Sequence, residues 1–308
     1  MGRYGSGQAV RRIEDAALLA GRGLYAGDAT LPGQTWLVFV RSPHPHARIG
    51  AIDVSAARAM PGVLAIFSGA ELAAAGVKPI PGGGLPRADG SPCASPPRRA
   101  LAHEVVRYVG EPVVAVVAES REGAREAAES VMIDYEPLPA VVDTLQAVRP
   151  GAPVICPEAP DNISAETRYG DAKATAAAFE SAVHTVSIDV ENQRLAPSPI
   201  EPRSVLAAFD EKGGRLTMRL STQMPTAVRE GLAAAIPGLT SKNVRVVVGD
   251  VGGGFGMKTG CYPEDIAVGY AALKVKRPVK WVAERIEEFL SAVHGRDSVS
   301  RAELALDR

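Results

Sequence analysis

The sequence predicts an α+β fold in two domains, residues 1–150 and residues 151–308. Short apolar runs typical of strands alternate with Ala-rich segments typical of helices along the whole chain. Residues 145–170 shift to Pro, Gly, Asn and Asp, a composition typical of the connection between two domains. The length of 308 residues also suits about two domains of ~150 residues each.

The first domain is expected to open with a strand at residues 35–41, where five consecutive apolar residues indicate burial on both faces. Further elements follow as strands at 49–54 and 63–68 and as helices at 55–60, with Ser55 as its cap, and 69–75. The clearest unit is an apolar strand at 112–118, a helix from about 121 to 130 capped by Ser120, and a strand at 131–135. This order predicts a βαβ unit with a right-handed crossover.

The elements of the second domain are predicted from the same kinds of pattern. Residues 203–209 and 214–221 predict a hairpin with its turn at 212–214. Residues 244–249 predict a buried strand, and residues 225–236 a helix that ends near Pro237. The remaining elements are expected as helices at 172–180 and 265–274 and as strands at 182–191, 279–283 and 302–306.

Composition and charge argue against several classes of protein. The formal net charge is −1, and no block of Lys and Arg indicates nucleic acid as a partner. No apolar run reaches the ~18 residues of a transmembrane segment, and the N-terminus has no secretory signal, so we expect a cytoplasmic protein. The three cysteines lie far apart with no Cys-x-x-Cys pair, so we expect free thiols rather than disulfides, a zinc site or an iron–sulfur cluster.

The strongest functional signal is the Gly-rich loop, which runs from Gly252 to Lys258 directly after the predicted strand at 244–249. Glycine adopts positive φ and lets the backbone lie close to a ligand. Successive N–H groups in such a turn bind oxygen atoms that carry negative charge. We interpret the loop as a cradle for an oxyanion, a phosphate or a metal-oxo group. A flexible or tight turn is the alternative, which the embedded Phe255 disfavours.

Two nucleotide-binding motifs fail on this loop. A dinucleotide fingerprint has its third glycine at the place of Met257, after Gly252 and Gly254. A phosphate-binding loop needs a glycine directly before Lys258, where Met257 again stands.

Two other segments have candidate binding residues. Gln223 lies between a strand end and a helix start, where its amide N–H can be a fixed donor, although a solvated surface side chain is the alternative. Residues 192–203 hold three prolines, which force an extended segment, and its Glu201 and Arg203 are candidates for an ion pair in what is otherwise a stiff connector. His44 and His46 have no third ligand nearby, so we expect no metal site built from these side chains.

In this order and spacing, these segments resemble the molybdenum-binding large subunit of the xanthine dehydrogenase, aldehyde oxidase and aerobic carbon monoxide dehydrogenase family. The parts that look like its α/β hammerhead domain are residues 21–25, 41–49 and 110–118. The parts that look like its first molybdopterin-binding domain are residues 192–203, residues 221–223 and the Gly-rich loop. The resemblance implies a hammerhead domain at 1–150 followed by a molybdopterin-binding α+β domain at 151–308 that is incomplete at its C-terminus.

The resemblance implies cofactor-binding roles for Gln223, Gly253, Gly254, Phe255 and Gly256. Gln223 matches the glutamine that hydrogen-bonds the apical oxo group of molybdenum, and Phe255 matches the residue whose main chain approaches the metal. The implied cofactor is Mo-molybdopterin in its cytosine dinucleotide form. The implied partners are an iron–sulfur small subunit with [2Fe–2S] clusters and an FAD medium subunit.

The implied activity is that of a molybdenum-dependent oxidoreductase, which hydroxylates an aldehyde, an N-heterocycle or a similar small substrate with water as oxygen source. Thr259 stands where purine-oxidising members have Glu, which argues against purines. Residues 262–263 and 284–285 look closer to the carbon monoxide dehydrogenase-like and bacterial aldehyde-oxidising or heterocycle-oxidising branch, which is chemically mixed and does not fix a substrate.

The family's general-base Glu lies C-terminal of the stretch that this sequence resembles, so no catalytic residue is expected up to Arg308. Activity is therefore expected to need further polypeptide, and a second chain that completes the molybdenum subunit is one way to supply it. The alternative is a non-catalytic scaffold half or an inactive fragment that binds no cofactor without a partner chain.

Overall fold

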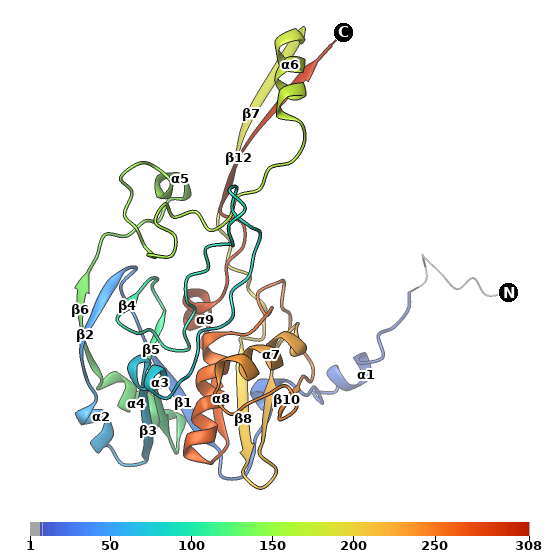
Figure 1. The fold of residues 1–308 in the computed structure, drawn as a ribbon. Coiled ribbons are helices and arrows are strands. Elements are labelled where there is room, and N and C mark those ends of the chain that lie inside the picture. The colour runs from blue at the N-terminus through green and yellow to red at the C-terminus, as the bar shows by residue number, and fades with distance from the viewer. Residues whose placement is uncertain (1–6, 8, 308) are drawn as a thin grey trace, which may run out of the picture.

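A seven-stranded sheet forms the centre of the structure, a computed structural model that describes residue 7 and residues 9–307 (Figure 1). The strand order is β10-β9-β8-β11-β1-β5-β3. These strands are β1 (Thr35–Arg41), β3 (Val63–Ser68), β5 (Pro112–Ala118), β8 (Ser204–Asp210), β9 (Arg215–Leu220), β10 (Val244–Val247) and β11 (Val279–Val282). Because β1 pairs in parallel with β11, strands from both sides of residue 150 share one sheet. The division into domains at residue 150 stays a prediction.

Both faces of this sheet are covered by helices, which explains why every residue of β5 is buried. Ala115 and Val117 contribute to a core shared with α7 (Pro225–Ala235) and α8 (Pro263–Val275). Val114 and Val116 point to the opposite face, as alternate residues of a strand do, and join a second core with α4 (Arg121–Glu129). Ser120 caps α4 as predicted, because its hydroxyl accepts a hydrogen bond from Gly123 N at 3.0 Å.

A second, three-stranded sheet shows that the predicted βαβ unit is wrong. Its strands are β4 (Val105–Val106), β2 (Ala47–Asp53) and β6 (Met132–Pro137). The strand that follows α4 is β6, which pairs antiparallel with β2 and does not return to the sheet that contains β5. Alternate residues of β6 are exposed, so this strand suits a sheet with one open face rather than a fully buried parallel sheet.

Other predictions at the level of single elements had mixed outcomes. The hairpin of β8 and β9 is confirmed. Ser55 is not a cap, because it is the first residue of α2 (Ser55–Ala59) and its own N–H donates to Asp53 Oδ1 at 2.8 Å. The strand β10 is shorter than predicted and lies at the edge of the sheet, where half-buried positions replace the expected burial.

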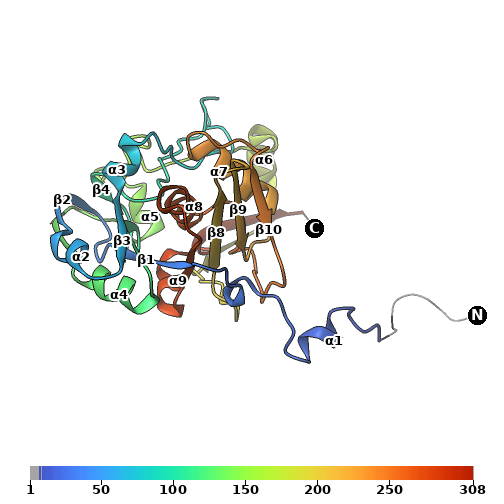
Figure 2. The same cartoon turned by 90° about the horizontal axis from the view of Figure 1, so that it is seen from below.

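The remaining elements lie around this centre. They are α1 (Asp15–Leu18), a short 3-10 helix (Ala26–Asp28), α3 (Gly69–Ala74), α5 (Thr144–Ala147), α6 (Ala172–Ser181), β7 (His184–Asn192), α9 (Arg285–Ser291) and β12 (Ser298–Leu306). Figure 2 shows the N-terminal segment with α1 leading away from the body. Across the described residues, no helix combines the length and the apolar character needed to cross a membrane.

We expect Leu37→Ala to lower the free energy of unfolding by about 2–5 kcal/mol, because it leaves a cavity in the core at the strand that joins both parts of the sheet. Leu37 is 2% exposed, whereas Leu64 in β3 is 39% exposed, so Leu64→Ala is the matched control and should cost clearly less. Urea unfolding followed by tryptophan fluorescence measures both, since Trp36 and Trp281 lie on the paired strands β1 and β11. Equal losses from the two variants would contradict the placement of Leu37.

Candidate functional site

The Gly-rich loop is held at both ends by one carboxylate. Oε2 of Glu201 accepts hydrogen bonds from Gly252 N at 2.8 Å and from Ser221 Oγ at 2.7 Å. It also pairs with Lys258 Nζ at 2.9 Å. The loop therefore begins and ends against the same side chain, which comes from the proline-rich segment at 192–203.

Lys258 is fully buried, and Glu201 supplies its counter-charge. Burial lowers the pKa of the Lys258 ammonium, and the hydrogen bond and charge of Glu201 oppose that effect. Oε1 of Glu201 is buried as well and meets no hydrogen-bond donor among the residues that the structure describes. The single pairing at Oε2 is thus what keeps the ammonium in the interior.

Gln223 contacts the loop through its backbone and its side chain. Its N–H donates to Lys258 O at 2.8 Å, and its Oε1 accepts from Gly256 N at 3.1 Å. A Cβ at position 254 would lie 2.5 Å from Oε1 of Gln223, so a larger residue there would have to displace the Gln223 side chain. The structure thus brings together Gln223, Gly254 and Gly256, which the sequence singled out separately.

The approach to the loop is fixed by a second close backbone contact. Asp250 accepts a hydrogen bond from Leu24 N at its Oδ2, over 2.6 Å, and its own N–H donates to Leu24 O at 3.2 Å. A Cβ at Gly249 would lie 2.1 Å from Leu24 O. The strand end and the N-terminal segment therefore hold the start of the loop between them.

The backbone of the loop leaves donors available and uses most of its acceptors. Gly253, Phe255 and Gly256 have φ values of 98°, 50° and 83°, which place them in the left-handed region. The carbonyls of Gly252, Gly254, Gly256, Met257 and Lys258 each accept a hydrogen bond. The consecutive N–H groups of Gly253, Gly254 and Phe255 donate to no acceptor among the described residues. A run of free N–H groups in a turn of this kind fits a ligand with negatively charged oxygens.

A buried ion cluster of Arg203, Glu264 and Glu288 lies beside the residues that hold the loop. Arg203 Nη1 lies 3.0 Å from Glu264 Oε2, and its Nε lies 3.5 Å from Glu288 Oε2. The guanidinium also lies 3.9 Å from the ring centre of Tyr262. The predicted pair between Glu201 and Arg203 is therefore wrong, because Arg203 already faces two carboxylates on other elements and Glu201 faces Lys258.

The charges in this cluster adjust one another's pKa values. Burial alone would raise the pKa of Glu264, but Arg203 and Arg41 outweigh it and lower that pKa to about 2. Burial raises the pKa of Glu288 despite its contact with Arg203. Burial would lower the pKa of Arg203, and the two carboxylates raise it above its ordinary value instead.

Tyr262 connects the ion cluster to the loop, a role that the sequence did not reveal. Its hydroxyl donates to Met257 O and accepts from Val293 N at 3.2 Å. Its N–H donates to Asp265 Oδ2 at 2.8 Å. The sequence singled out residues 262–263 only as part of the family resemblance, which indicated none of these contacts.

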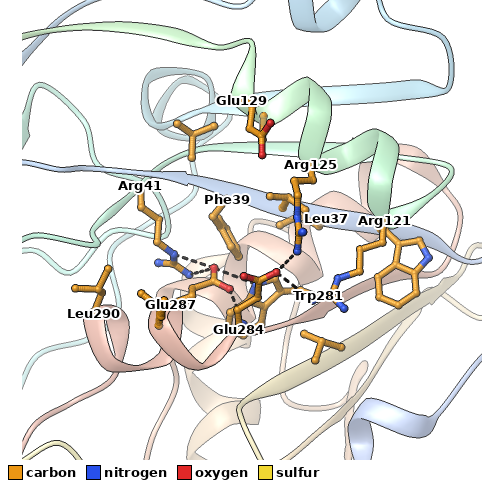
Figure 3. A pocket seen from close by; sticks show the side chains of 16 residues that line it. Leu37, Phe39, Arg41, Arg121, Arg125, Glu129, Trp281, Glu284, Glu287 and Leu290 are labelled. Carbon is orange, nitrogen blue, oxygen red and sulfur yellow. Dashed lines mark hydrogen bonds and ion pairs between the residues drawn. The ribbon is translucent and has the colours of Figure 1, made fainter.

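A hollow of about 540 Å³ lies between β1, α4 and α9, and none of the residues that line it belongs to the Gly-rich loop (Figure 3). Arg121 and Arg125 of α4 both reach the carboxylate of Glu284, and Arg41 pairs with Glu287 at 2.7 Å. The arginines of the hollow are thus each paired with a carboxylate, and Glu129 adds a further negative charge to its lining. Nothing in its chemistry competes with the loop as the place for an anionic ligand.

Two known sequence families match the chain. Residues 20–139 match the a/b hammerhead domain of aldehyde oxidase and xanthine dehydrogenase. Residues 155–308 match a molybdopterin cofactor-binding domain. The second match includes Glu201, Gln223 and the whole Gly-rich loop.

Individual relatives match almost the whole chain. The nicotine 6-hydroxylase large subunit of Paenarthrobacter nicotinovorans is 40% identical over 94% of this chain and 35% of its own length. The carbon monoxide dehydrogenase large chain of Afipia carboxidovorans is 36% identical over 98% of this chain and 37% of its own length. The crystal structure of quinoline 2-oxidoreductase from Pseudomonas putida 86 has a TM-score of 0.89 at 34% identity, over 98% of this chain and 37% of that one. The chain thus spans little more than a third of each relative.

We expect Glu201→Ala to lower the free energy of unfolding by about 3–5 kcal/mol, because it leaves the Lys258 ammonium buried without a counter-charge. Lys258→Met removes the charge and keeps an aliphatic side chain, so it should cost less in the Glu201→Ala background than in the wild type. Urea denaturation of the two single variants and the double variant gives this coupling energy. Strictly additive losses would show that the two side chains do not depend on each other.

Asp265→Asn should remove a pH dependence of stability. Burial raises the pKa of Asp265 from 3.8 to about 7, so between these values the folded protein holds a proton that the unfolded chain releases. The free energy of unfolding of the wild type should therefore fall as the pH rises through this window, and the variant should lose that part of the slope. Urea unfolding at about pH 5 and pH 8 compares the two proteins. Parallel losses in both would contradict the protonated state of Asp265.

Proposed function

Because the chain belongs to the aldehyde oxidase and xanthine dehydrogenase family, we propose that it forms the cofactor-binding N-terminal part of a molybdenum hydroxylase subunit. The single observation that carries the proposal is the convergence of Gln223 and the Gly-rich loop, within a match to a molybdopterin cofactor-binding domain. The bound cofactor would supply the metal centre at which a small substrate is oxidised with water as oxygen source.

In this proposal the loop holds the cofactor through main-chain donors. The free N–H groups of Gly253, Gly254 and Phe255 suit oxygen atoms with negative charge, and the absence of a Cβ at Gly254 keeps the contact open. The side chain of Phe255 is 74% exposed, so it is free to contact the cofactor or the part of the enzyme that encloses it.

Gln223 would contribute a positioned amide donor. Its Oε1 is already engaged by Gly256 N at 3.1 Å, which fixes the plane of the amide and leaves the NH₂ group as the free end. That NH₂ group donates to no acceptor in the described part of the chain. A donor held in this way can bind an oxo oxygen without reorganising at the moment of reaction.

The substrate class that we propose is an aldehyde, an N-heterocycle or a similar small molecule. Support comes from the names of the relatives, which act on nicotine, carbon monoxide and quinoline. Thr259 has a local role, since its hydroxyl donates to Gly256 O at 2.8 Å, and it offers no carboxylate at the position that purine-oxidising members use. Purines are therefore outside the proposal.

We further propose an iron–sulfur small subunit and an FAD medium subunit as partners, and the cytosine dinucleotide form of the cofactor. Two relatives are named as a large subunit and a large chain, which supports an assembly of several subunits. A cytoplasmic location is part of the same proposal, and the free thiols of Cys93, Cys156 and Cys261 are consistent with it.

We expect Gln223→Ala to lower both the molybdenum content and the turnover of the assembled enzyme, with turnover reduced by about 10²–10³-fold, because one positioned donor is lost. The fold should be unaffected, since Gln223 is exposed. Metal analysis and steady-state kinetics of the purified complex make the measurement. Gln146→Ala is the control, because Gln146 is an exposed glutamine on α5, in a different part of the chain.

Gly254→Ala tests the same contact from the other side. The new methyl group would lie 2.5 Å from Gln223 Oε1 and must displace the amide. If complexes with either variant retain the molybdenum and the turnover of the wild type, the role proposed for Gln223 is wrong. If no complex that contains the wild-type chain ever holds molybdenum, the chain is a non-catalytic scaffold.

A further inference from the structure

An arm built from α6, β7 and β12 projects from the body of the molecule (Figure 1). All nine residues of β7 are exposed, and in β12 only Ala305 is half-buried. The helix α6 contains no buried residue. The arm therefore has no core of its own in the described part of the chain.

The ribbon of β7 and β12 has one apolar and one polar face. The strands pair antiparallel, with Val186 opposite Leu304 and Ile188 opposite Ala302, so these four side chains share a face. The residues between them, such as Ser187 and Asp189, lie on the other face. The apolar face is formed mainly by Val186, Ile188, Val190, Ala302, Leu304 and Leu306, with Ser300 opposite Val190 and His184 opposite Leu306. The polar face is formed mainly by Thr185, Ser187, Asp189, Glu191, Arg301 and Glu303.

This apolar face is too exposed to be stable as it stands. Val186 and Ile188 are each 59% exposed, and Leu304 is 57% exposed. A two-stranded ribbon is marginally stable in water unless a face is covered or a further strand is added. Each strand here pairs only with the other, so the two outer edges also keep unpaired backbone groups.

The base of the arm is fixed to the segment that supplies Glu201. Arg194 pairs with Asp297 at 2.6 Å, and Leu195 bridges to Gly295 through backbone hydrogen bonds. Both contacts tie the ribbon to the proline-rich segment that ends at Glu201 and Arg203. A partner that covers the arm would therefore also stabilise the proline-rich segment, whose Glu201 binds both ends of the Gly-rich loop.

We propose that the apolar face of the arm is the docking surface for the part of a molybdenum subunit that the relatives have outside the matched stretch. The matches include the arm, since they cover 98% of this chain, yet they cover only 37% of quinoline 2-oxidoreductase and of the carbon monoxide dehydrogenase large chain. Those chains thus hold the same arm together with more than half of their length that can cover it. The occupant is expected to present an apolar surface and a strand edge. This inference rests on the proposed function.

The probe for the test is the part of the nicotine 6-hydroxylase large subunit that lies outside its match to this chain, produced as a separate polypeptide. The matched stretch of that same subunit, also produced separately, is the positive control for the probe. Binding to the tagged 308-residue chain is measured by interferometry. Amide hydrogen exchange followed by mass spectrometry then shows which segments become protected.

Two matched variants locate the surface. Ile188→Lys puts a charge on the apolar face, and Ser187→Lys puts the same charge on the polar face one residue away. We expect Ile188→Lys to weaken binding by about tenfold or more and Ser187→Lys to change it by less than about twofold. Leu304→Lys on the partner strand should repeat the effect of Ile188→Lys, and unfolding curves of the free variants should match the wild type because all three positions are exposed.

The proposal would be supported if the probe binds and protects the amides of β7 and β12. Ile188→Lys should weaken this binding, and Ser187→Lys should not. The proposal would be overturned by no binding, by equal effects of both variants, or by a second copy of this chain that protects the ribbon. Molybdenum content is measured separately in the same complexes. Docking through the arm without molybdenum would contradict the proposed function only, whereas molybdenum uptake that Ile188→Lys leaves unchanged would contradict the docking surface only.

Discussion

The buried pairing of Arg203 with Glu264 and Glu288 is the interaction on which the candidate site depends. These charges remain in the interior only because each meets an opposite charge, since an unpaired one costs several kcal/mol. Arg203 directly precedes β8, Glu264 lies at the start of α8, and Glu288 lies in the middle of α9. Their pairing therefore fixes how these elements meet. The ring centre of Trp281 in β11 lies 5.4 Å from the guanidinium carbon of Arg203, so β11 contacts the cluster as well.

The same cluster determines where the Gly-rich loop can lie. A loop with four glycines loses much conformational freedom on folding, so it needs strong anchors. One anchor is Tyr262, whose ring packs on the Arg203 guanidinium and whose hydroxyl donates a hydrogen bond to Met257 O. The other is Glu201, two residues before Arg203, which binds Gly252 N and Lys258. Tyr262 contacts the ion cluster and Glu201 lies two residues from it in sequence, so both anchors connect the cluster to the loop.

Local sequence patterns predicted the helices and strands far better than they predicted which side chains pair with one another. The apolar run of β5 and the cap at Ser120 are local, and both predictions are confirmed. The sequence did not predict the helix α9. Its fully buried residue is Glu288, which is stabilised by charge pairing and breaks the apolar periodicity. The pair assigned to Glu201 and Arg203 failed because it would have left Glu264 and Glu288 buried without that cation, which no local pattern can reveal. The members of the site were predictable singly, but the hydrogen bond from Gly256 to Gln223 was not.

The hydrogen bonds already made inside the loop determine which ligand it can bind. Five of its carbonyls accept hydrogen bonds within the chain, whereas the consecutive N–H groups of Gly253, Gly254 and Phe255 have no acceptor among the described residues. The oxygen of Gln223 is engaged as well, which leaves its N–H groups outward. The charge of Lys258 is neutralised by Glu201 and adds no attraction of its own. A ligand must therefore present acceptors to fixed dipoles, as the oxo and phosphate oxygens of a molybdopterin cofactor do and a cation does not.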